Sequence, residues 1–519
     1  MDELSRENTY ADLIKTALER YPSRIAFVHE GREFTYARMR DLLGRTIRVL
    51  AERGVGAGTG LAVLSTNRPE AWLAAAAIVM LGGRYTALHP LGSLDDLRHI
   101  CADAEIHTLV FDPSAFDEKA AALAAGGSLA NVLALGRSSF APSLLGLADK
   151  TSPAPLVANV MPADVSSVLY TGGTTGQPKG VAHPQRVWNN MILTVLADFE
   201  LPDCPRYLAA APITHAAGMM IMPVLLRGGT VFLHPGFEPE RFLATIASAR
   251  INLCFGVPTM IYVLLDHPAL ERTDLSSLET FLYAAAPMSP TRLGEALRRI
   301  GPVFTQAYAQ TESGGTGTVL AKADHDPSSP GRLASCGKSM STVRIEIHDE
   351  EGREVPVGEA GEICLRGPSV MEAYWKQPEL TAETLRGGWL HTGDMATRDE
   401  DGFFTIVDRK KDMIVSGGFN VFPREIEDIL SSVPAVALCA VVGVPDDKWG
   451  EAVKAVVVRK PGAPVTAPEL IALVKEKKGS VYAPKSVDFV DAIPLTAVGK
   501  ADKKALRAPY WSGQGRLVH

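Results

Sequence analysis

The chain has 519 residues, of which 46% are hydrophobic and 21% are charged, so it is long enough for two or more domains with packed cores. Its formal net charge is −7 and its lysines are scattered rather than gathered in stripes, which argues against a nucleic acid as partner. The six cysteines show no regular spacing, so we expect reduced core or surface thiols rather than a disulfide framework or a metal site.

The sequence predicts neither a signal peptide nor a transmembrane segment. Its start, MDELSRENTY, is polar and acidic. The longest apolar run, AWLAAAAIVML at 71–81, stops at Gly82 and is too short to span a bilayer. We therefore expect this run to be a buried helix and the protein to be cytoplasmic.

Most of the sequence before Asp408 alternates helix-like and strand-like segments. Apolar periodicity predicts helices at 37–54, 239–250 and 289–300, an Ala-rich surface helix at 118–126, and strands at 60–65, 206–213 and 229–234. Ser289 and Pro290 are placed as N-cap and first-turn residues. This alternation predicts an α/β fold, a large layered body with mostly parallel sheets.

Residues 170–180, YTGGTTGQPKG, follow a strand-like run and form the most informative loop of the chain. Glycines let a backbone turn tightly and bring its N–H groups close to an anion. The threonine hydroxyls and Lys179 add donors and a positive charge suited to phosphate. Because Pro178 precedes the lysine and Gly180 follows it, the loop is not a Walker A loop. We predict a phosphate loop of another kind, with a plain Gly/Thr turn as the alternative.

Near Asp408 the sequence takes on the character of a smaller α+β unit. A helix is predicted through REIEDILSSV after Pro423, a second helix has capping-box spacing at Thr466 and Glu469, and strands are predicted at 438–444, 452–460 and 486–493. These features predict an N-terminal domain at 1–409 and a C-terminal lid domain at 410–519. The charged segment DRKKD, with Lys411 in it, is predicted to be the hinge.

Further motifs follow the loop at 170–180 in a fixed order. They are QAYAQTE (306–312), GEICLRGPSVMEAYW (361–375), HTGD (391–394), DRKKDMIVSGGFNVFPREIE (408–427) and PLTAVGK (494–500). With these motifs the chain resembles the adenylate-forming superfamily of acyl- and aryl-CoA synthetases, peptide-synthetase adenylation domains and firefly-type luciferases. It is most similar to the fatty-acyl and aryl-CoA ligases, which implies a mobile C-terminal lid.

The resemblance implies ATP or acyl-AMP, Mg²⁺ and coenzyme A as ligands. It assigns catalytic roles to Lys179, Thr311, Glu312, Lys411 and Lys500. It assigns nucleotide and CoA binding to Thr171, Gly172, Gly173, Thr174, Thr175, Gly176, Ala284, Ala285, Ala286, Pro287, Tyr308, Ala309, Asp394, Arg409, Gly417 and Gly418.

Several of these assignments carry a specific role. Glu312 would hold Mg²⁺, which prefers oxygen ligands, and Lys500 would bridge the acid and the α-phosphate. Tyr308 would stack on adenine, Asp394 would accept the ribose hydroxyls, and Gly418 would line the pantetheine tunnel. Without the motifs, Glu312 and Lys500 would be interpreted as ordinary exposed charges.

The expected substrate pocket comprises His215, Gly218, Met219 and Tyr283. His215 resembles a gate between the acyl and thiol sites, with a satisfied core histidine as the alternative. The segment PITHAAGMMIMPV lacks the aspartate that binds the ammonium in amino-acid-activating relatives, so we predict an acid without an α-amine. Small residues beside methionines indicate an adaptable pocket for a bulky aliphatic, aryl or polycyclic acid, unless the methionines are plain core.

Four positions depart from the family's usual residues, all on the ATP side. Gly172 stands where serine is expected, and Ala284, Ala307 and Ala309 stand where glycines are common. A methyl group can narrow a nucleotide site or exclude a positive φ, and one lost hydroxyl hydrogen bond is worth about 0.5–1.5 kcal/mol. Lys411 and Gly418, on the thiol side, match the family.

The predicted function is an acyl-CoA ligase that converts an acid and ATP to acyl-AMP and pyrophosphate, and then forms the CoA thioester. One alternative is a half-reaction enzyme that mainly thioesterifies a preformed acyl-AMP. Another is a non-catalytic nucleotide-binding relative, against which Lys500, Glu312 and Asp394 count. A carrier protein as acceptor, a partner adenylating enzyme and a homo-oligomer stay open.

Overall fold

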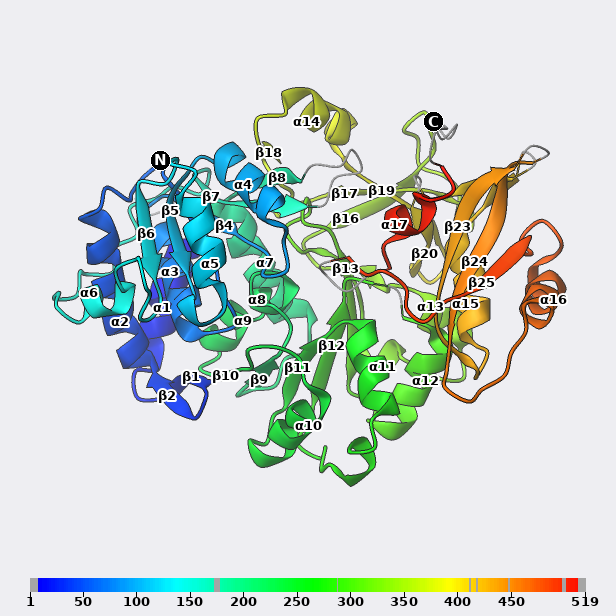
Figure 1. Cartoon of the computed structure of the whole chain (residues 1–519), viewed down its shortest axis with the longest axis horizontal. Helices are drawn as coiled ribbons and strands as arrows, with labels where there is room; N and C mark the ends of the chain where they lie inside the picture. Colours follow the sequence, from blue (N-terminus) through cyan, green and yellow to red (C-terminus); the bar gives the residue numbers. More distant parts are fainter. Residues whose placement is uncertain are drawn as a thin grey trace.

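The structure of the protein is a computed structural model that describes residues 8–171, 178–286, 288–409, 412–416, 419–446, 449–496 and 501–511. Four sheets organise it. In Figure 1 a seven-stranded sheet lies at the left in blue and cyan, a nine-stranded sheet runs through the lower part, a four-stranded sheet lies above it, and the C-terminal sheet is orange at the right.

The nine-stranded sheet has the order β15-β14-β13-β12-β11-β9-β10-β1-β2. Its strands are β1 (Ile25–His29), β2 (Arg32–Thr35), β9 (Arg206–Ala209), β10 (Thr230–Leu233), β11 (Leu253–Gly256), β12 (Thr280–Ala284), β13 (Phe304–Ala309), β14 (Gly317–Leu320) and β15 (Lys338–Ser339). The six strands from β13 to β1 pair in parallel, and the outer strands pair antiparallel. The predicted strand at 206–213 therefore ends earlier, at Ala209.

The seven-stranded sheet has the order β18-β8-β7-β4-β3-β5-β6. Its strands are β3 (Gly60–Leu64), β4 (Arg84–Ala87), β5 (Ile106–Phe111), β6 (Asn131–Ala134), β7 (Val165–Thr171), β8 (Lys179–Pro184) and β18 (Ala373–Tyr374). The five strands from β6 to β7 are parallel, and β8 returns antiparallel to β7. The prediction of a layered α/β body with mostly parallel sheets is confirmed.

Helices surround these two sheets, and one buried apolar cluster joins them. The helices are α1 (Tyr10–Arg20), α2 (Tyr36–Ala51), α3 (Pro69–Met80), α4 (Leu94–Asp103), α5 (Pro113–Ala124), α6 (Leu144–Ala148), α7 (Gln185–Asp198), α8 (Ala216–Met219), α9 (Ile221–Leu226), α10 (Pro239–Ser248), α11 (Pro258–Asp266), α12 (Pro290–Arg299), α13 (Pro330–Ala334) and α14 (Pro378–Thr384). The apolar run at 71–81 lies in α3 and is buried, as predicted.

One local helix prediction is confirmed and another needs correction. Ser289 is the N-cap residue of α12 and Pro290 begins the helix, as predicted, although the Ser289 hydroxyl is buried without a hydrogen-bond partner among the described residues. The Ala-rich segment in α5 is not wholly a surface helix, because Ala120 and Leu123 pack into a second core cluster.

The four-stranded antiparallel sheet was not predicted. Its strands, in spatial order, are β16 (Arg344–His348), β17 (Gly361–Arg366), β19 (Leu390–Arg398) and β20 (Phe404–Arg409). Its pairs join segments separated by loops of different lengths, so the register depends on tertiary packing rather than on a short hairpin signal.

The C-terminal unit is a small α+β domain, as predicted. Its sheet consists of β21 (Ile414–Ser416), β22 (Phe419–Val421), β23 (Val436–Asp446), β24 (Gly450–Arg459) and β25 (Ser486–Phe489), with α15 (Pro423–Ser431), α16 (Ala467–Lys478) and α17 (Lys503–Arg507). Pro423 opens α15, and the Glu469 carboxylate accepts hydrogen bonds from the N–H and hydroxyl of Thr466 before α16. Both predicted helix starts are confirmed.

Two further features concern the cysteines and the apolar character of the helices. All six cysteines are free, and Cys204 alone among them is exposed. Among the helices of the described ranges, none has both the length and the apolar character that a bilayer crossing requires.

Candidate active site

The loop predicted to bind phosphate connects β7 and β8. Thr171 at the end of β7 pairs directly with Lys179 at the start of β8, so the loop closes a hairpin. Its residues Gly172, Gly173, Thr174, Thr175 and Gly176 lie outside the described residues. The Thr171 hydroxyl is buried and has no hydrogen-bond partner in the part of the chain that the structure describes.

Lys179 lies in a three-residue network at the base of this hairpin. Its ammonium donates to the Tyr374 hydroxyl at 2.9 Å, and that hydroxyl donates to Oε1 of Glu312 at 2.8 Å. The ammonium also lies 4.0 Å from the same carboxylate oxygen and 4.0 Å from the centre of the Tyr374 ring. Burial lowers the pKa of Lys179, and Glu312 opposes this shift. The network holds a cation and a carboxylate together around one tyrosine.

Asp394 forms a second polar centre, on β19. Its Oδ2 accepts hydrogen bonds from the Tyr308 hydroxyl at 2.8 Å and from the Gln310 side-chain amide at 2.7 Å. Gln310 also donates to the Thr392 carbonyl at 2.8 Å, which ties the HTGD motif to the end of β13. Burial, and then Asp394, raises the pKa of Tyr308 well above its usual value. Arg409 pairs with Asp394 across β19 and β20 through its backbone.

The turn after β13 connects these two centres. Tyr308 and Gln310 reach Asp394, while Glu312, two residues further, reaches Tyr374. The Thr311 carbonyl between them accepts a hydrogen bond from Nε2 of His183 on β8, at 2.7 Å. Burial lowers the pKa of His183 to about 4. The motif QAYAQTE thus contacts both the β7–β8 hairpin and the HTGD segment.

Ala285 has an unusual backbone conformation on the predicted adenine side. Its φ is +74°, in the left-handed region that favours glycine, whereas Ala284 ends β12 and Ala309 ends β13. The expectation that a methyl group at Ala284 or Ala309 would exclude a required positive φ is therefore wrong, because both residues lie in extended strands. The strained position is the neighbouring Ala285, since a left-handed residue with a Cβ costs about 1–2 kcal/mol.

His215 lies at the N-terminal end of α8, in the segment predicted to bind the acid. Its ring packs edge-on against His89 with centroids 4.7 Å apart, and its Nδ1 lies 2.9 Å from the Thr214 hydroxyl. Burial, and then His89, lowers the pKa of His215 to about 4. Both histidines are therefore kept in an environment that favours the neutral ring.

Close packing explains the glycines of this segment. A Cβ on Gly218 would lie 1.8 Å from the Ile213 carbonyl oxygen, so no side chain fits there. The Met219 methyl fills the space beside Gly315, where a Cβ would lie 1.6 Å from it. Met220, Met222 and Met260 are core residues, which agrees with the plain-core alternative for these methionines.

Tyr283 lies deeper than a pocket-lining residue would. It is fully buried, and its hydroxyl lies 3.1 Å from both Oε1 of Gln306 and Nε2 of His325. The structure thus places Tyr283 in the core beneath Ala284, and its role in a substrate pocket stays a prediction.

Several predicted site residues are not covered. Pro287, Lys411, Gly417, Gly418 and Lys500 lie outside the described residues, as does the side chain of Arg409. Their assignments stay predictions. Conversely, sequence reasoning did not single out Gln310, Tyr374, His183 and His89. Gln310 and Tyr374 lie inside motifs that were identified, so their polar groups were a usable signal, whereas His183 and His89 carry none in the sequence.

Comparison with known proteins identifies the family. The AMP-binding enzyme family model matches residues 14–375, and the AMP-binding enzyme C-terminal domain matches residues 425–500. The medium/long-chain-fatty-acid–CoA ligase FadD8 of Mycobacterium tuberculosis is 44% identical over 99% of this chain and 93% of its own. A feruloyl-CoA synthase of an Amycolatopsis species is 38% identical over 94% of this chain and 96% of its own. The crystal structure of ATP-bound MatB from Rhodopseudomonas palustris superposes with a TM-score of 0.88 at 31% identity, covering 96% of this chain and 99% of that one.

The matches to the AMP-binding enzyme family and to its C-terminal domain define an adenylate-forming enzyme. The chain belongs to the AMP-binding, adenylate-forming superfamily, and within it to the AMP-forming acid–CoA ligases.

Proposed function

We propose that this protein activates a carboxylic acid without an α-amine by forming an acyl-adenylate, and then transfers the acyl group to coenzyme A. One observation carries the proposal. Tyr308 at the end of β13 and Gln310 in the turn after it donate hydrogen bonds to Asp394. Glu312 in the same turn bonds to Tyr374 and lies 4.0 Å from Lys179. A nucleotide laid along this turn would have its ribose at Asp394 and its phosphates at the β7–β8 hairpin.

The polar groups suit the charges of the first reaction. Attack of a carboxylate on the α-phosphate brings two anions together, so fixed positive charge and hydrogen-bond donors must surround that phosphorus. Lys179 supplies a half-buried cation, 27% exposed, that is held by Tyr374. The unpartnered Thr171 hydroxyl supplies a donor at the mouth of the loop. We propose that these two groups bind the phosphates.

Glu312 fits the family's requirement for Mg²⁺. Its side chain is 12% exposed, and its oxygen is bonded to a neutral hydroxyl rather than locked in a close ion pair. Mg²⁺ is bound in proteins by one or two carboxylates together with substrate phosphates and water. Glu312 would hold the ion, which when bound neutralises charge on the phosphates.

We propose that residues 410–519 form a lid that moves relative to 1–409, with Lys411 at the hinge. β20 ends at Arg409 in the four-stranded sheet, and β21 begins at Ile414 in the C-terminal sheet. Only a short connection therefore links the two sheets. In this proposal Lys500 meets the acid and the α-phosphate in one lid position, and Gly418 meets the thiol in the other.

The acid is proposed to be a bulky aliphatic or aryl acid. The segment at 212–220 carries no acidic side chain that would bind a substrate ammonium. Burial also lowers the pKa of both His89 and His215, which disfavours a charged ring there. Relatives named as fatty-acid and feruloyl-CoA ligases are consistent with such a substrate.

The test is a screen of carboxylic acids in which pyrophosphate release and CoA-thioester formation are measured together. We expect both products from one class of apolar acid, and neither from amino acids. Lys500→Ala should abolish pyrophosphate release yet leave thioester formation from a supplied acyl-AMP largely intact. Lys504→Ala, an exposed lysine of α17, is the control and should change neither. If Lys500→Ala also fails to use the supplied adenylate, the role proposed for Lys500 is wrong.

A further inference from the structure

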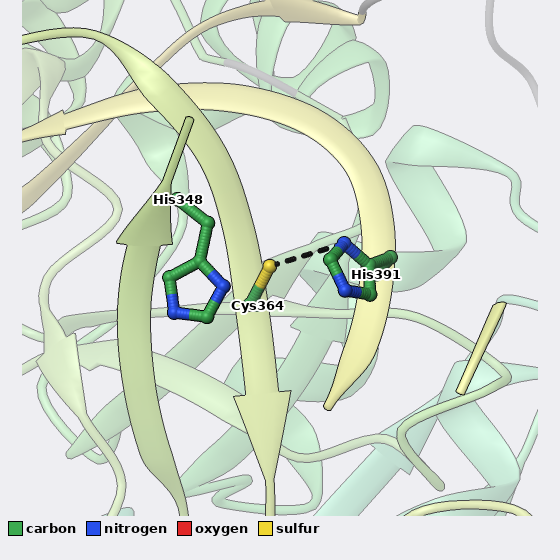
Figure 2. Close-up of side chains that lie close together, drawn as sticks. All are labelled: His348, Cys364 and His391. Atoms are coloured by element: carbon green, nitrogen blue, oxygen red, sulfur yellow. Dashed lines mark hydrogen bonds between the residues drawn. The ribbon is translucent and has the colours of Figure 1, made fainter. Parts of the chain in front are cut away.

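A cluster of metal-ligand side chains lies on the four-stranded sheet, beside the nucleotide site but outside it. His348, Cys364 and His391 come from the adjacent strands β16, β17 and β19, and their ligand atoms lie within 4.8 Å of one another. Figure 2 shows the three side chains pointing toward one another, with the sulfur between the two rings. We propose that this cluster is a binding site for a thiophilic divalent cation, with Zn²⁺ as the natural choice.

The strand register places these residues together. Cys364 is paired with Glu346 on one side and with His391 on the other, while His348 is paired with Glu362. Residues two apart on a strand share a face, so Glu362 stands on the same face as Cys364. One patch of the sheet therefore presents a thiol, two imidazoles and two carboxylates.

The spacing suits tetrahedral coordination. The Cys364 sulfur lies 3.4 Å from Nδ1 of His391, and Oε2 of Glu362 lies 3.1 Å from the same nitrogen. With Zn–S near 2.3 Å and Zn–N or Zn–O near 2.1 Å, tetrahedral ligand atoms stand about 3.3–3.6 Å apart. The sulfur and Nδ1 of His391 are thus close to the required separation, whereas Glu362 is not part of the group whose ligand atoms all lie within 4.8 Å of one another. Cys364, His348 and His391 would supply three ligands after a small inward movement, and water would take the fourth position.

His348 gives an independent indication of a ligand. Its Nε2 is bonded to the Glu346 carboxylate at 2.8 Å, which fixes the proton on that nitrogen. The side chain is only 4% exposed, and its Nδ1 is buried without a hydrogen-bond partner among the described residues. Figure 2 shows a ring nitrogen of His348 facing the sulfur of Cys364. A histidine oriented by a carboxylate with its other nitrogen free is the usual arrangement of a zinc ligand.

Binding of a divalent cation changes the charges and protons of the cluster. When the ion binds, the Cys364 thiol gives up its proton to solvent, and the thiolate balances one of the two positive charges. Glu346 and Glu362 lie beside the cluster, but each is already paired with an arginine, Arg344 and Arg386 respectively. Nδ1 of His391 is bonded to Oε2 of Glu362 and would exchange this contact for the ion, with its proton moved to Nε2.

The site is connected to the nucleotide side. Oε1 of Glu362 accepts the Gly393 N–H at 2.8 Å, and the Thr392 hydroxyl donates to the Ile363 carbonyl at 2.8 Å. A cation that holds His391 would therefore fix the backbone that leads to Asp394. We expect amide hydrogen exchange in 390–396 to slow when the cation binds.

The experiment uses the full chain, stripped with a chelator and kept reduced, in a Cys204→Ser background that removes the exposed thiol. Co²⁺ and Zn²⁺ are the probes. We expect one Co²⁺ per chain with a thiolate-to-cobalt charge-transfer band, which Zn²⁺ displaces. Cys364→Ser should remove the band, and His348→Gln should weaken binding by about tenfold or more. Cys336→Ser, which removes another buried thiol, should leave binding unchanged.

Two results would overturn the site. One is the lack of a charge-transfer band in the Cys204→Ser protein, since binding at Glu312 or another oxygen site gives no thiolate band. The other is a band that persists in Cys364→Ser. If Cys364→Ser does not fold, His348→Gln decides: unchanged Co²⁺ affinity in that variant contradicts the proposal. Slower exchange at 390–396 on addition of Zn²⁺, lost in His348→Gln, would support it.

Discussion

Ala285 concentrates backbone strain at the nucleotide side of the site, because it holds φ at +74° with a Cβ attached. We predict that Ala285→Gly stabilises the protein. Relief of about 1–2 kcal/mol of left-handed strain is set against the about 0.4–1 kcal/mol that glycine costs through the unfolded chain, so the net gain is up to about 1.6 kcal/mol. The measurement is the midpoint of thermal or urea unfolding of the N-terminal domain.

Ala284→Gly is the matched control, since it removes the same methyl one residue earlier. Ala284 is extended at the end of β12, so glycine relieves no strain there and should destabilise by about 0.5–1 kcal/mol. Shifts of opposite sign in the two variants are the expected result. Equal destabilisation by both would show that Ala285 is not strained in solution.

Tyr374 is the hydroxyl that joins Lys179 to Glu312, and Tyr374→Phe removes it while keeping the ring beneath the ammonium. Hydrogen bonds to charged groups are worth about 1.5–3 kcal/mol, so we predict a loss of roughly 10- to 100-fold in pyrophosphate release per unit ATP. Thioester formation from a supplied acyl-AMP should change much less, because it needs no triphosphate.

Tyr36→Phe is the control for this variant. It also removes a buried hydroxyl with two hydrogen bonds, to the carbonyls of Leu225 and Gly229, but far from the hairpin in sequence and contacts. We expect it to lower stability without changing the balance of the two half-reactions. A similar loss of pyrophosphate release in both variants would show that Tyr374 has only a structural role.

His183 ties β8 to the turn after β13, and its buried ring makes this connection sensitive to acid. Its pKa is lowered to about 4 because burial disfavours the charged ring. Between pH 6.5 and 4 the unfolded chain therefore binds a proton that the folded chain does not, so folding stability falls as pH falls through this range. The slope for one such histidine is at most about 1.4 kcal/mol per pH unit.

His183→Gln should lower stability at pH 7.5 but flatten the loss between pH 7 and 5, measured as the change in unfolding temperature with pH. His99→Gln is the control, because His99 is partly exposed and its Nε2 lies 3.2 Å from the Pro178 carbonyl oxygen. An unchanged pH slope in His183→Gln would mean that the ring is not held neutral by the fold.

Local signals predicted some elements well and others not at all. The capping residues of α16, the proline start of α15 and the apolar run of α3 each depend on neighbours in sequence, so a short segment was sufficient to place them. The four-stranded sheet depends on a register that pairs residues 14 to 35 positions apart, which no local pattern encodes.

The candidate site, too, could be predicted from the sequence only in part. The motifs located Glu312 and Asp394, but the contacts of Tyr374 and Gln310 with them arise from pairing of distant strands. Ser289 shows that a local signal can place a residue without its contacts: it is the N-cap residue, as predicted, but its buried hydroxyl has no hydrogen-bond partner among the described residues. His348, Cys364 and His391 could not be grouped from the sequence, since their spacing matches no metal motif.

The lid proposal can be tested at the short connection between β20 and β21. Lys411→Pro would fix φ and remove a backbone N–H at the proposed hinge. We predict that thioester formation falls more than pyrophosphate release, since only the second reaction requires the new lid position. Lys322→Ala is the control, since it removes a lysine that is distant from the hinge. Lys376→Pro would not serve, because Lys376 has a positive φ, which proline cannot adopt. Equal loss of both reactions in Lys411→Pro contradicts alternation.

Taken together, the two halves of the site differ in how closely they follow the family. In the proposed site, Gly172 lacks the hydroxyl of the family's usual serine and Ala285 carries strain, whereas Lys411 and Gly418 match the residues that the family uses for the thiol. A missing donor weakens the binding of a triphosphate, and attack at phosphorus tolerates little misplacement. We therefore predict that adenylation is the slower half-reaction of this enzyme.

The measurement compares pyrophosphate release from acid and ATP with CoA-thioester formation from the corresponding synthetic acyl-AMP. We expect transfer from acyl-AMP to be faster, because it bypasses the triphosphate. Gly172→Ser combined with Ala285→Gly should raise pyrophosphate release, while Ala284→Gly and Ala309→Gly should add little, since both residues are in extended strands. Rapid pyrophosphate release by the unmodified protein with its own acid would show that these departures are neutral, and that both half-reactions run at comparable rates.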